Sequence, residues 1–369
     1  MNNANKGVVG AISALALLAS ASLSGAADLT PQEQALVEAA KEEGAVTIIN
    51  PLFSDRTGQR MAEAFINRYD LGSDFEFNNL RKGTGATVAQ VRQEIQAGKF
   101  TVDLILVSAP GFFAAGAERD AFEAIDSGAW KDSEGLAKKA GQYFNYPYVV
   151  TPLAYTFQPV WNTACPGMED FSVSSYSDAV VDAVKGKTIS SDITKSFTYT
   201  NTVIALGKAG AVDFNTFWDE LKTTDPIVEF RTEPKMQMVI SCQRPFDMWN
   251  LSGRVYQNVL KQPNLAEKIK IGSYEEGHVM LGNQIAVLKG AEHPNAAKLL
   301  VEFLLSEEGS DIFVEGEAIY SFREGYSPPQ AAAPYLLDLN DIKLIGMDDW
   351  VGAQAEFEDV RGKWQDRFQ

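Results

Sequence analysis

The repeated order of helices and strands constrains this fold more than any other feature of the sequence. Residues 30–44 begin with a helix-capping pattern and repeat apolar side chains at helical spacing, and the strand-like run 45–49 follows. Helical spacing returns at 61–69, and the continuous apolar run 102–107 is typical of a strand buried on both faces. Because strand-helix-strand units favour open sheets covered by helices, we predict an α/β fold with a mostly parallel sheet.

A second series of strands and helices follows an interruption at about 126–155. It covers 187–251, and a further strand at 284–289 leads into a long apolar helix. The length of 369 residues also favours two lobes over one. We therefore expect a division into two discontinuous lobes, with lobe 1 comprising 28–110 and 280–330 and lobe 2 comprising 111–279 and 331–369.

The first 27 residues have the pattern of an export signal. Lys6 precedes an apolar run at 8–23, and the small residues at 24–27 suit cleavage by signal peptidase. An N-terminal anchor helix fits less well, because the run is short and rich in alanine, glycine and serine. No cysteine stands at the cleavage point to carry a lipid. We expect a soluble mature protein in the periplasm.

The charged residues and cysteines exclude several classes of function. The 32 basic and 49 acidic residues give a net charge of −17, which argues against a nucleic-acid groove or an anionic-membrane surface. Cys165 and Cys242 are candidates for one disulfide in an oxidising compartment. A zinc site is not expected with His278 and His293 as the only histidines. We predict no metal and no cofactor.

Catalytic motifs are few. The chain has no G-x-S-x-G, C-x-x-C or H-E-x-x-H sequence, and the glycines at 83–85 and 186–188 do not complete a nucleotide-binding loop. We therefore predict a binding protein and not an enzyme. A secreted hydrolase is the alternative from another class, with His278 as its base.

The expected architecture predicts where a ligand binds. In open α/β sheets, ligands lie beyond the carboxyl ends of the strands. Lys195 and Arg254 both stand at the start of a predicted helix in such a segment, where free N–H groups favour an anion. A guanidinium also holds a carboxylate or phosphate through two parallel hydrogen bonds. The segments that follow strands are 50–56, 108–112, 192–197 and 251–256.

Three segments carry a resemblance to a known family: 36–49, 81–106 and above all 287–309, with its His-Pro-Asn-Ala-Ala-Lys helix start. They resemble the extracellular solute-binding proteins of ABC importers, in the branch that contains the periplasmic iron(III)-binding proteins. The resemblance implies a type 2 periplasmic-binding-protein fold, in which two α/β lobes joined by two crossing strands close on a ligand. It also implies a monomer that delivers its solute to a membrane permease.

The chain departs from the iron-binding pattern in the loop 251–256. Iron-binding members present two adjacent tyrosines there, whereas this loop has Gly253 and Arg254, with only Tyr256 nearby. A ferric ion needs anionic oxygen ligands, and a guanidinium opposes it. Ferric iron, bare or chelated by an organic acid, is therefore the alternative ligand.

The sequence as a whole predicts capture of an anionic small organic molecule, such as a carboxylate, a phosphate ester or a phosphonate. The loop 194–196 resembles the one with which the family holds an anion, and Tyr155 stands where the family often faces the cleft. Tyr155 or Trp249 would supply an aromatic surface. The expected ligand-binding residues are Ser54, Arg56, Ser108, Tyr155, Thr194, Lys195, Ser196, Trp249, Arg254 and Tyr256.

Overall fold

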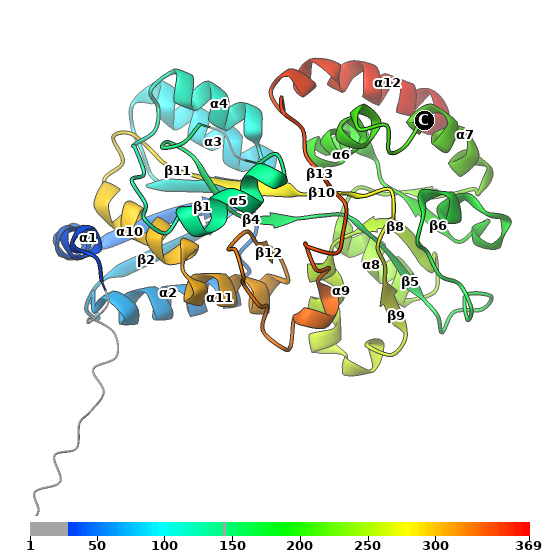
Figure 1. Cartoon of the computed structure of the whole chain (residues 1–369), viewed down its shortest axis with the longest axis horizontal. Helices are drawn as coiled ribbons and strands as arrows, with labels where there is room; N and C mark the ends of the chain where they lie inside the picture. Colours follow the sequence, from blue (N-terminus) through cyan, green and yellow to red (C-terminus); the bar gives the residue numbers. More distant parts are fainter. Residues whose placement is uncertain (1–28, 143–144) are drawn as a thin grey trace, which may run out of the picture.

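A computed structural model describes residues 29–142 and 145–369 of the chain. The predicted export signal lies outside the described residues. Figure 1 shows two α/β lobes side by side, with strands passing between them through the middle of the molecule. Within the described residues, no helix has the length and apolar character needed to cross a membrane.

Lobe 1 is built on a six-stranded sheet with the order β12-β4-β11-β3-β1-β2. β1 pairs in parallel with β2 and β3, whereas β11 is antiparallel to β3 and β4, and β12 is antiparallel to β4. The strands are β1 (Ala45–Asn50), β2 (Glu76–Arg81), β3 (Leu104–Val107), β4 (Val150–Tyr155), β11 (Leu281–Val287) and β12 (Tyr320–Ser321).

The helices of lobe 1 follow from apolar stripes that face this sheet. Phe65, Leu104 and Phe303, from α2, β3 and α10, are fully buried in one core. The capping box predicted at 30–33 is present, since Thr30 Oγ1 accepts from the Glu33 backbone N–H and Glu33 Oε2 accepts from that of Thr30. The helices are α1 (Pro31–Glu43), α2 (Asp55–Tyr69), α3 (Thr84–Ala97), α4 (Pro110–Glu118), α5 (Lys131–Lys139), α10 (Pro294–Leu305) and α11 (Glu307–Glu317).

Lobe 2 is built on a five-stranded sheet with the order β7-β6-β8-β5-β9. Its strands are β5 (Gln158–Asn162), β6 (Thr188–Ser190), β7 (Ile227–Val228), β8 (Phe246–Asn250) and β9 (Ile269–Ile271). Its helices are α6 (Phe197–Lys208), α7 (Phe214–Thr223), α8 (Thr232–Ile240), α9 (Ser252–Lys261) and α12 (Phe357–Phe368). Short 3₁₀ helices are η1 (Tyr176–Val180), η2 (Asp182–Val184), η3 (Ile193–Lys195), η4 (Pro263–Leu265), η5 (Ala333–Tyr335) and η6 (Gly352–Glu356).

Three segments connect the lobes, one more than the resemblance implied. The chain leaves lobe 1 from β4 into β5, and it returns from β9 through β10 (His278–Val279) into β11. The third segment runs from β12 to α12 and contains β13 (Leu344–Ile345), which pairs in parallel with β10 between the lobes (Figure 1).

The two-lobe α/β fold predicted from the sequence is confirmed, but two details differ. Both sheets are mixed and not mostly parallel, because a strand that returns from the other lobe enters its sheet in the opposite direction. The expected boundary at 110/111 also does not coincide with a change of lobe. Phe113, Trp130 and Leu153 all pack in the cores of lobe 1, and the chain crosses to lobe 2 only after β4.

The two cysteines form a disulfide in lobe 2. Cys165 and Cys242 have their Cα atoms 5.5 Å apart and are separated by 77 residues in sequence. The bridge joins the segment after β5 to the end of α8. It lies within one lobe and leaves the connection between the lobes unconstrained.

Candidate functional site

Two adjoining cavities lie between the lobes, at the carboxyl ends of the central strands. The first, of about 150 Å³, is named here the Arg254 cavity, and its lining includes Thr84, Ser108, Asn283, Glu317, Gly253 and Arg254. The second, of about 160 Å³, is named the Phe197 cavity, and its lining includes Thr84, Arg92, Ser108, Phe197, Asn201 and Gln354. Thr84 and Ser108 line both cavities, so the two are neighbours.

All four segments that the sequence placed after strands contribute to these cavities. Pro51 and Leu52 follow β1, Ser108 follows β3, Phe197 follows η3, and 251–254 follow β8. Carboxyl ends of strands from both sheets thus meet at one place. The two cavities form the candidate ligand site.

Arg254 supplies the positive charge of the first cavity. Its Nε donates to Thr232 Oγ1 at 3.0 Å and its Nη1 donates to Gln257 Oε1 at 2.7 Å. None of the ion pairs in the described part of the chain includes Arg254, and its Nη2 has no acceptor there. Burial lowers the pKa of the guanidinium, which nevertheless stays charged at neutral pH. The carboxylates of Glu233 and Glu317 act on this charge from nearby, but the direct hydrogen-bond partners are neutral, and such a half-buried cation is suited to an anionic ligand.

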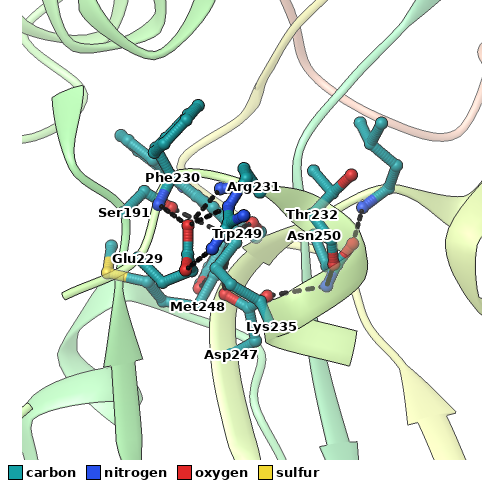
Figure 2. Close-up of polar contacts among 12 residues, drawn as sticks. Ser191, Glu229, Phe230, Arg231, Thr232, Lys235, Asp247, Met248, Trp249 and Asn250 are labelled. Atoms are coloured by element: carbon teal, nitrogen blue, oxygen red, sulfur yellow. Dashed lines mark hydrogen bonds and ion pairs between the residues drawn. The ribbon is translucent and has the colours of Figure 1, made fainter. Parts of the chain in front are cut away.

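A buried polar network in lobe 2 (Figure 2) lies beside the start of α9, whose first turn carries Arg254. Lys235 and Asp247 are fully buried, and Lys235 Nζ lies 3.0 Å from Asp247 Oδ1 and 2.8 Å from Ser191 Oγ. Asn250 Nδ2 donates to Asp247 Oδ2 at 2.8 Å and to the Thr232 carbonyl at 3.2 Å. Because Thr232 also accepts from Arg254, the network positions the guanidinium at the start of α9.

Glu317 closes the same cavity from lobe 1. Its Oε2 accepts from Gln257 Nε2 at 2.7 Å, and its Oε1 accepts from the Ser54 backbone N–H at 2.8 Å and from Thr57 Oγ1 at 2.5 Å. Arg254, Gln257 and Glu317 therefore form a chain of hydrogen bonds from one lobe to the other. Both carboxylate oxygens of Glu317 already have partners, which leaves Arg254 available to a ligand.

Tyr155 lies where the chain leaves lobe 1, at the boundary between the lobes. Burial raises the pKa of its hydroxyl to about 12, although the side chains of Thr198 in lobe 2 and Ser108 in lobe 1 act to lower it. The ring lines the Arg254 cavity. The hydroxyl is therefore neutral at physiological pH.

Solved structures were found that share this fold. The protein is similar to the periplasmic binding protein AfuA from Actinobacillus pleuropneumoniae with fructose-6-phosphate bound, at 17% identity and a TM-score of 0.68, over 88% of this chain and 98% of that one. It is similar to iron-bound HitA from Pseudomonas aeruginosa at 17% identity and a TM-score of 0.65, over 88% and 99% of the two chains. The apo ferric ion-binding protein A of Pasteurella haemolytica has 14% identity and a TM-score of 0.67, over 88% and 98%. This chain has the fold of a periplasmic binding protein. No family model and no curated protein matches the sequence.

Three of the residues predicted to bind ligand line the cavities of this periplasmic-binding-protein fold. They are Ser108, Tyr155 and Arg254. Ser54 contacts the cavity lining only indirectly. It caps α2, and its backbone N–H donates to the cavity residue Glu317. Arg56 is exposed and lines neither cavity.

The predicted anion loop 194–196 lies beside the Phe197 cavity without lining it. Asp192 accepts from Thr194 Oγ1 at 2.5 Å and forms an ion pair with Lys195 at 3.2 Å. The hydroxyl and the ammonium group are therefore already paired with a carboxylate of the protein itself. Ser196 caps α6 through the Tyr199 backbone N–H. The sequence reveals that this loop contains a lysine. It does not reveal that Lys195 pairs with Asp192, because that pairing depends on the turn of the backbone.

Two predicted aromatic residues lie in hydrophobic cores. Trp249 is 2% exposed, donates from Nε1 to the Tyr176 hydroxyl at 2.9 Å, and stacks on Tyr199. Tyr256 is buried, packs against Tyr335, and lines neither cavity. Neither side chain lines a cavity, since β8 buries Trp249 in the core of lobe 2 and α9 packs Tyr256 against Tyr335.

His278 is a buried structural residue. Its Nε2 accepts from the Tyr274 backbone N–H at 3.0 Å and lies 2.9 Å from Ser273 Oγ, and burial lowers its pKa to about 4. It does not line either cavity. In residues 29–142 and 145–369, no group of three or more His, Cys, Asp or Glu side chains is placed to hold a metal ion.

The sequence reasoning missed two asparagines that line the cavities, Asn283 and Asn201. Asn283 lies within the apolar strand β11 and Asn201 within α6. A polar residue inside an otherwise apolar buried strand was the signal available for Asn283, because such groups need a partner.

A larger cavity, of about 780 Å³, lies away from the strand ends, between α5, β12 and the segment 323–340. Its arginine, Arg323, already pairs with Asp132 at 3.0 Å. Among the described residues, no side chain lining this cavity has a buried polar atom without a partner. Of these three cavities, only the two smaller ones are thus lined by buried polar atoms without a partner in the described chain.

Proposed function

We propose that this protein is the substrate-binding component of an ABC uptake transporter and acts in the periplasm without catalysing a reaction. The fold shared with AfuA, HitA and the ferric ion-binding protein supports this class of function. The scarcity of catalytic motifs in the sequence and the buried position of His278 favour binding over hydrolysis. The partner is then a membrane permease, which receives the solute when the lobes open.

The solute in this proposal is a small organic anion, such as a carboxylate, a phosphate ester or a phosphonate. The observation that carries it is the guanidinium of Arg254, which lines the interlobe cavity and has no ion pair in the described part of the chain. Charge-assisted hydrogen bonds contribute about 1.5 to 3 kcal/mol each. Three of them at the upper end of this range, about 9 kcal/mol, reach the roughly 8 kcal/mol of a micromolar complex, and two need further contacts with the solute.

The alternative ligand, ferric iron, receives less support from the geometry. Tyr256 packs on Tyr335 away from the cavities, and Arg254 stands where a cation would have to bind. Iron-bound HitA and the ferric ion-binding protein A keep this alternative within the test, because proteins of this fold bind both kinds of ligand.

A thermal-shift screen tests the proposal. Organic acids, phosphate esters, phosphonates, neutral sugars and ferric salts are each added to the protein at high concentration, since ligand at about 100 times its Kd adds roughly 2.7 kcal/mol of stability. We expect stabilisation by at least one organic anion and none by neutral sugars. Stabilisation by a ferric salt alone, with a tyrosinate absorption band, or by a neutral sugar alone would overturn it.

A further inference from the structure

Two buried asparagines at the cavity walls have polar atoms without partners. Asn283 is fully buried and lines the Arg254 cavity, and neither its Oδ1 nor its Nδ2 has a hydrogen bond to any described residue. Asn201 is 4% exposed and lines the Phe197 cavity, and its Oδ1 has no donor within 29–142 and 145–369. Both amides stand beside a cavity that has room for a partner.

These unpaired amides are exceptional in their own surroundings. Gln284, the next residue in β11, uses its whole amide: Nε2 donates to the Gly282 carbonyl at 2.7 Å and to Gln142 at 3.1 Å, and Oε1 accepts from the Ala109 backbone N–H at 2.9 Å. The pairing of β11 with β4 shifts register between Asn283 and Ile285. Such bulges redirect side chains and are enriched next to binding sites. A buried amide without partners is costly, so its position at a cavity points to a ligand.

The chemistry of an amide specifies its partner. Oδ1 needs a donor and Nδ2 needs an acceptor, whereas an ionised carboxylate or phosphate only accepts. A hydroxyl group both donates and accepts from one atom, which suits a cavity of about 150 Å³. The hydroxyls of Thr84 and Ser108, which line both cavities, add further polar groups on the path between the two amides.

We propose that the cleft has two kinds of subsite, in which Arg254 holds the ionised group and Asn283 and Asn201 read hydroxyl groups of the same solute. The solute is then a hydroxylated organic anion. This inference rests on the proposed function, since it requires the anion that Arg254 holds to carry hydroxyl groups as well.

Matched pairs of anions that differ by hydroxyl groups test the inference. Calorimetric titrations compare malate with succinate, citrate with tricarballylate, and glycerol 3-phosphate with propyl phosphate. In at least one pair we expect the hydroxylated member to bind about tenfold more tightly or better. Asn283→Leu should reduce that ratio to near one, with Asn201→Leu as a second variant of the same kind.

The stability of the unliganded variants separates a binding role from a structural one. Asn283→Leu removes unpaired polar atoms, so its melting temperature without ligand should stay the same or rise. Asn162 is the matched control, because its Nδ2 donates to the Val239 carbonyl at 3.1 Å and its Oδ1 accepts from the Ala164 backbone N–H at 3.0 Å. Asn162→Leu should melt at a lower temperature and keep the hydroxyl preference.

The outcomes distinguish this inference from the function on which it rests. If both members of every pair bind equally, or if the asparagine variants keep the hydroxyl preference, the amides hold water only and the inference is overturned while anion binding stands. If Arg254→Gln weakens both members of a pair and Asn283→Leu weakens only the hydroxylated one, both are supported. If no anion binds the wild-type protein, the proposed function and the inference fall together.

Discussion

Gly253 at the start of α9 lies against the backbone carbonyl of Glu317 at the end of α11, so closely that a Cβ on Gly253 would be 2.2 Å from the carbonyl oxygen. The two residues belong to different lobes and both line the Arg254 cavity. The contact between the lobes is therefore made by backbone, which cannot move aside as a flexible side chain does. Glycine is required here by close approach and not by its dihedral angles.

Gly253→Ala should weaken ligand binding, because the added methyl group keeps α9 and α11 apart. We expect at least a tenfold loss of affinity for the anion identified by screening, with a small change in unfolding free energy. Gly207→Ala in α6 is the control, since a Cβ there meets nothing within 4 Å and alanine favours the helix by up to about 1 kcal/mol. Equal affinities for the wild type and the Gly253 variant would show that the lobes need not touch in the complex.

Replacing Lys235 should destabilise the protein strongly. Lys235→Met leaves the fully buried carboxylate of Asp247 without its cation, and breaking a buried pair in this way costs about 3 to 5 kcal/mol. Urea denaturation measures the loss. The double variant Lys235→Met with Asp247→Asn should recover part of it, and a loss below about 1 kcal/mol in the single variant would contradict the network described for Arg254.

His278 should make the protein less stable in mild acid. Burial lowers its pKa in the folded protein to about 4, whereas the unfolded chain has the ordinary value near 6.5. The contribution to stability is therefore complete above about pH 6.5 and is lost as the pH falls toward 4, by up to roughly 3 kcal/mol. Unfolding free energies at pH 7.5 and 4.5 should differ more in the wild type than in His278→Asn.

Glu302 affects the pH dependence of stability in the opposite direction over part of the same pH range. The effect of His278 is therefore measured by comparing the wild type with His278→Asn, since both contain Glu302. Burial raises its pKa to about 7, so its contribution to stability is lost as the pH rises through that value. An identical pH dependence in the wild type and His278→Asn would contradict the assignment to the histidine.

Removing the disulfide should lower stability without affecting the ligand. Opening a loop closed over 77 residues costs roughly 4 kcal/mol on the chain-entropy account. The double variant Cys165→Ala, Cys242→Ala should thus melt at a lower temperature and bind the anion normally, because neither cysteine lines a cavity. Loss of affinity in the folded variant would mean that the bridge also shapes the cleft.

The sequence predicted the parts of this molecule that depend on local pattern. The capping box at Thr30, the buried stripe at Met61 and Phe65, and the buried run ending at Val107 depend on residues close together in the chain. The location of the cavities followed from the rule for strand ends. Arg254 could be singled out because a cation is conspicuous in a chain with a net charge of −17.

Individual site residues were harder to predict, because their roles depend on distant partners. Lys195 has the same charge as Arg254, but the turn at 192–195 pairs it with Asp192. Asn283 and Gln284 are neighbours with similar amides, and only the bulge against β4 and the contacts of Gln284 separate them. Tertiary packing also placed Trp249 in the core, where its spacing in the strand was compatible with either face.

The central claim is that the guanidinium of Arg254 holds a negative charge between the lobes, and the affinity of Arg254→Gln for the screened anion tests it most directly. Isothermal titration should give a Kd at least 100-fold above that of the wild type, since two charge-assisted hydrogen bonds are lost. Arg60→Gln, which removes only an exposed ion pair with Glu315, should bind like the wild type. A Kd for Arg254→Gln within threefold of the wild-type value, in a variant that melts at the wild-type temperature, would contradict the account.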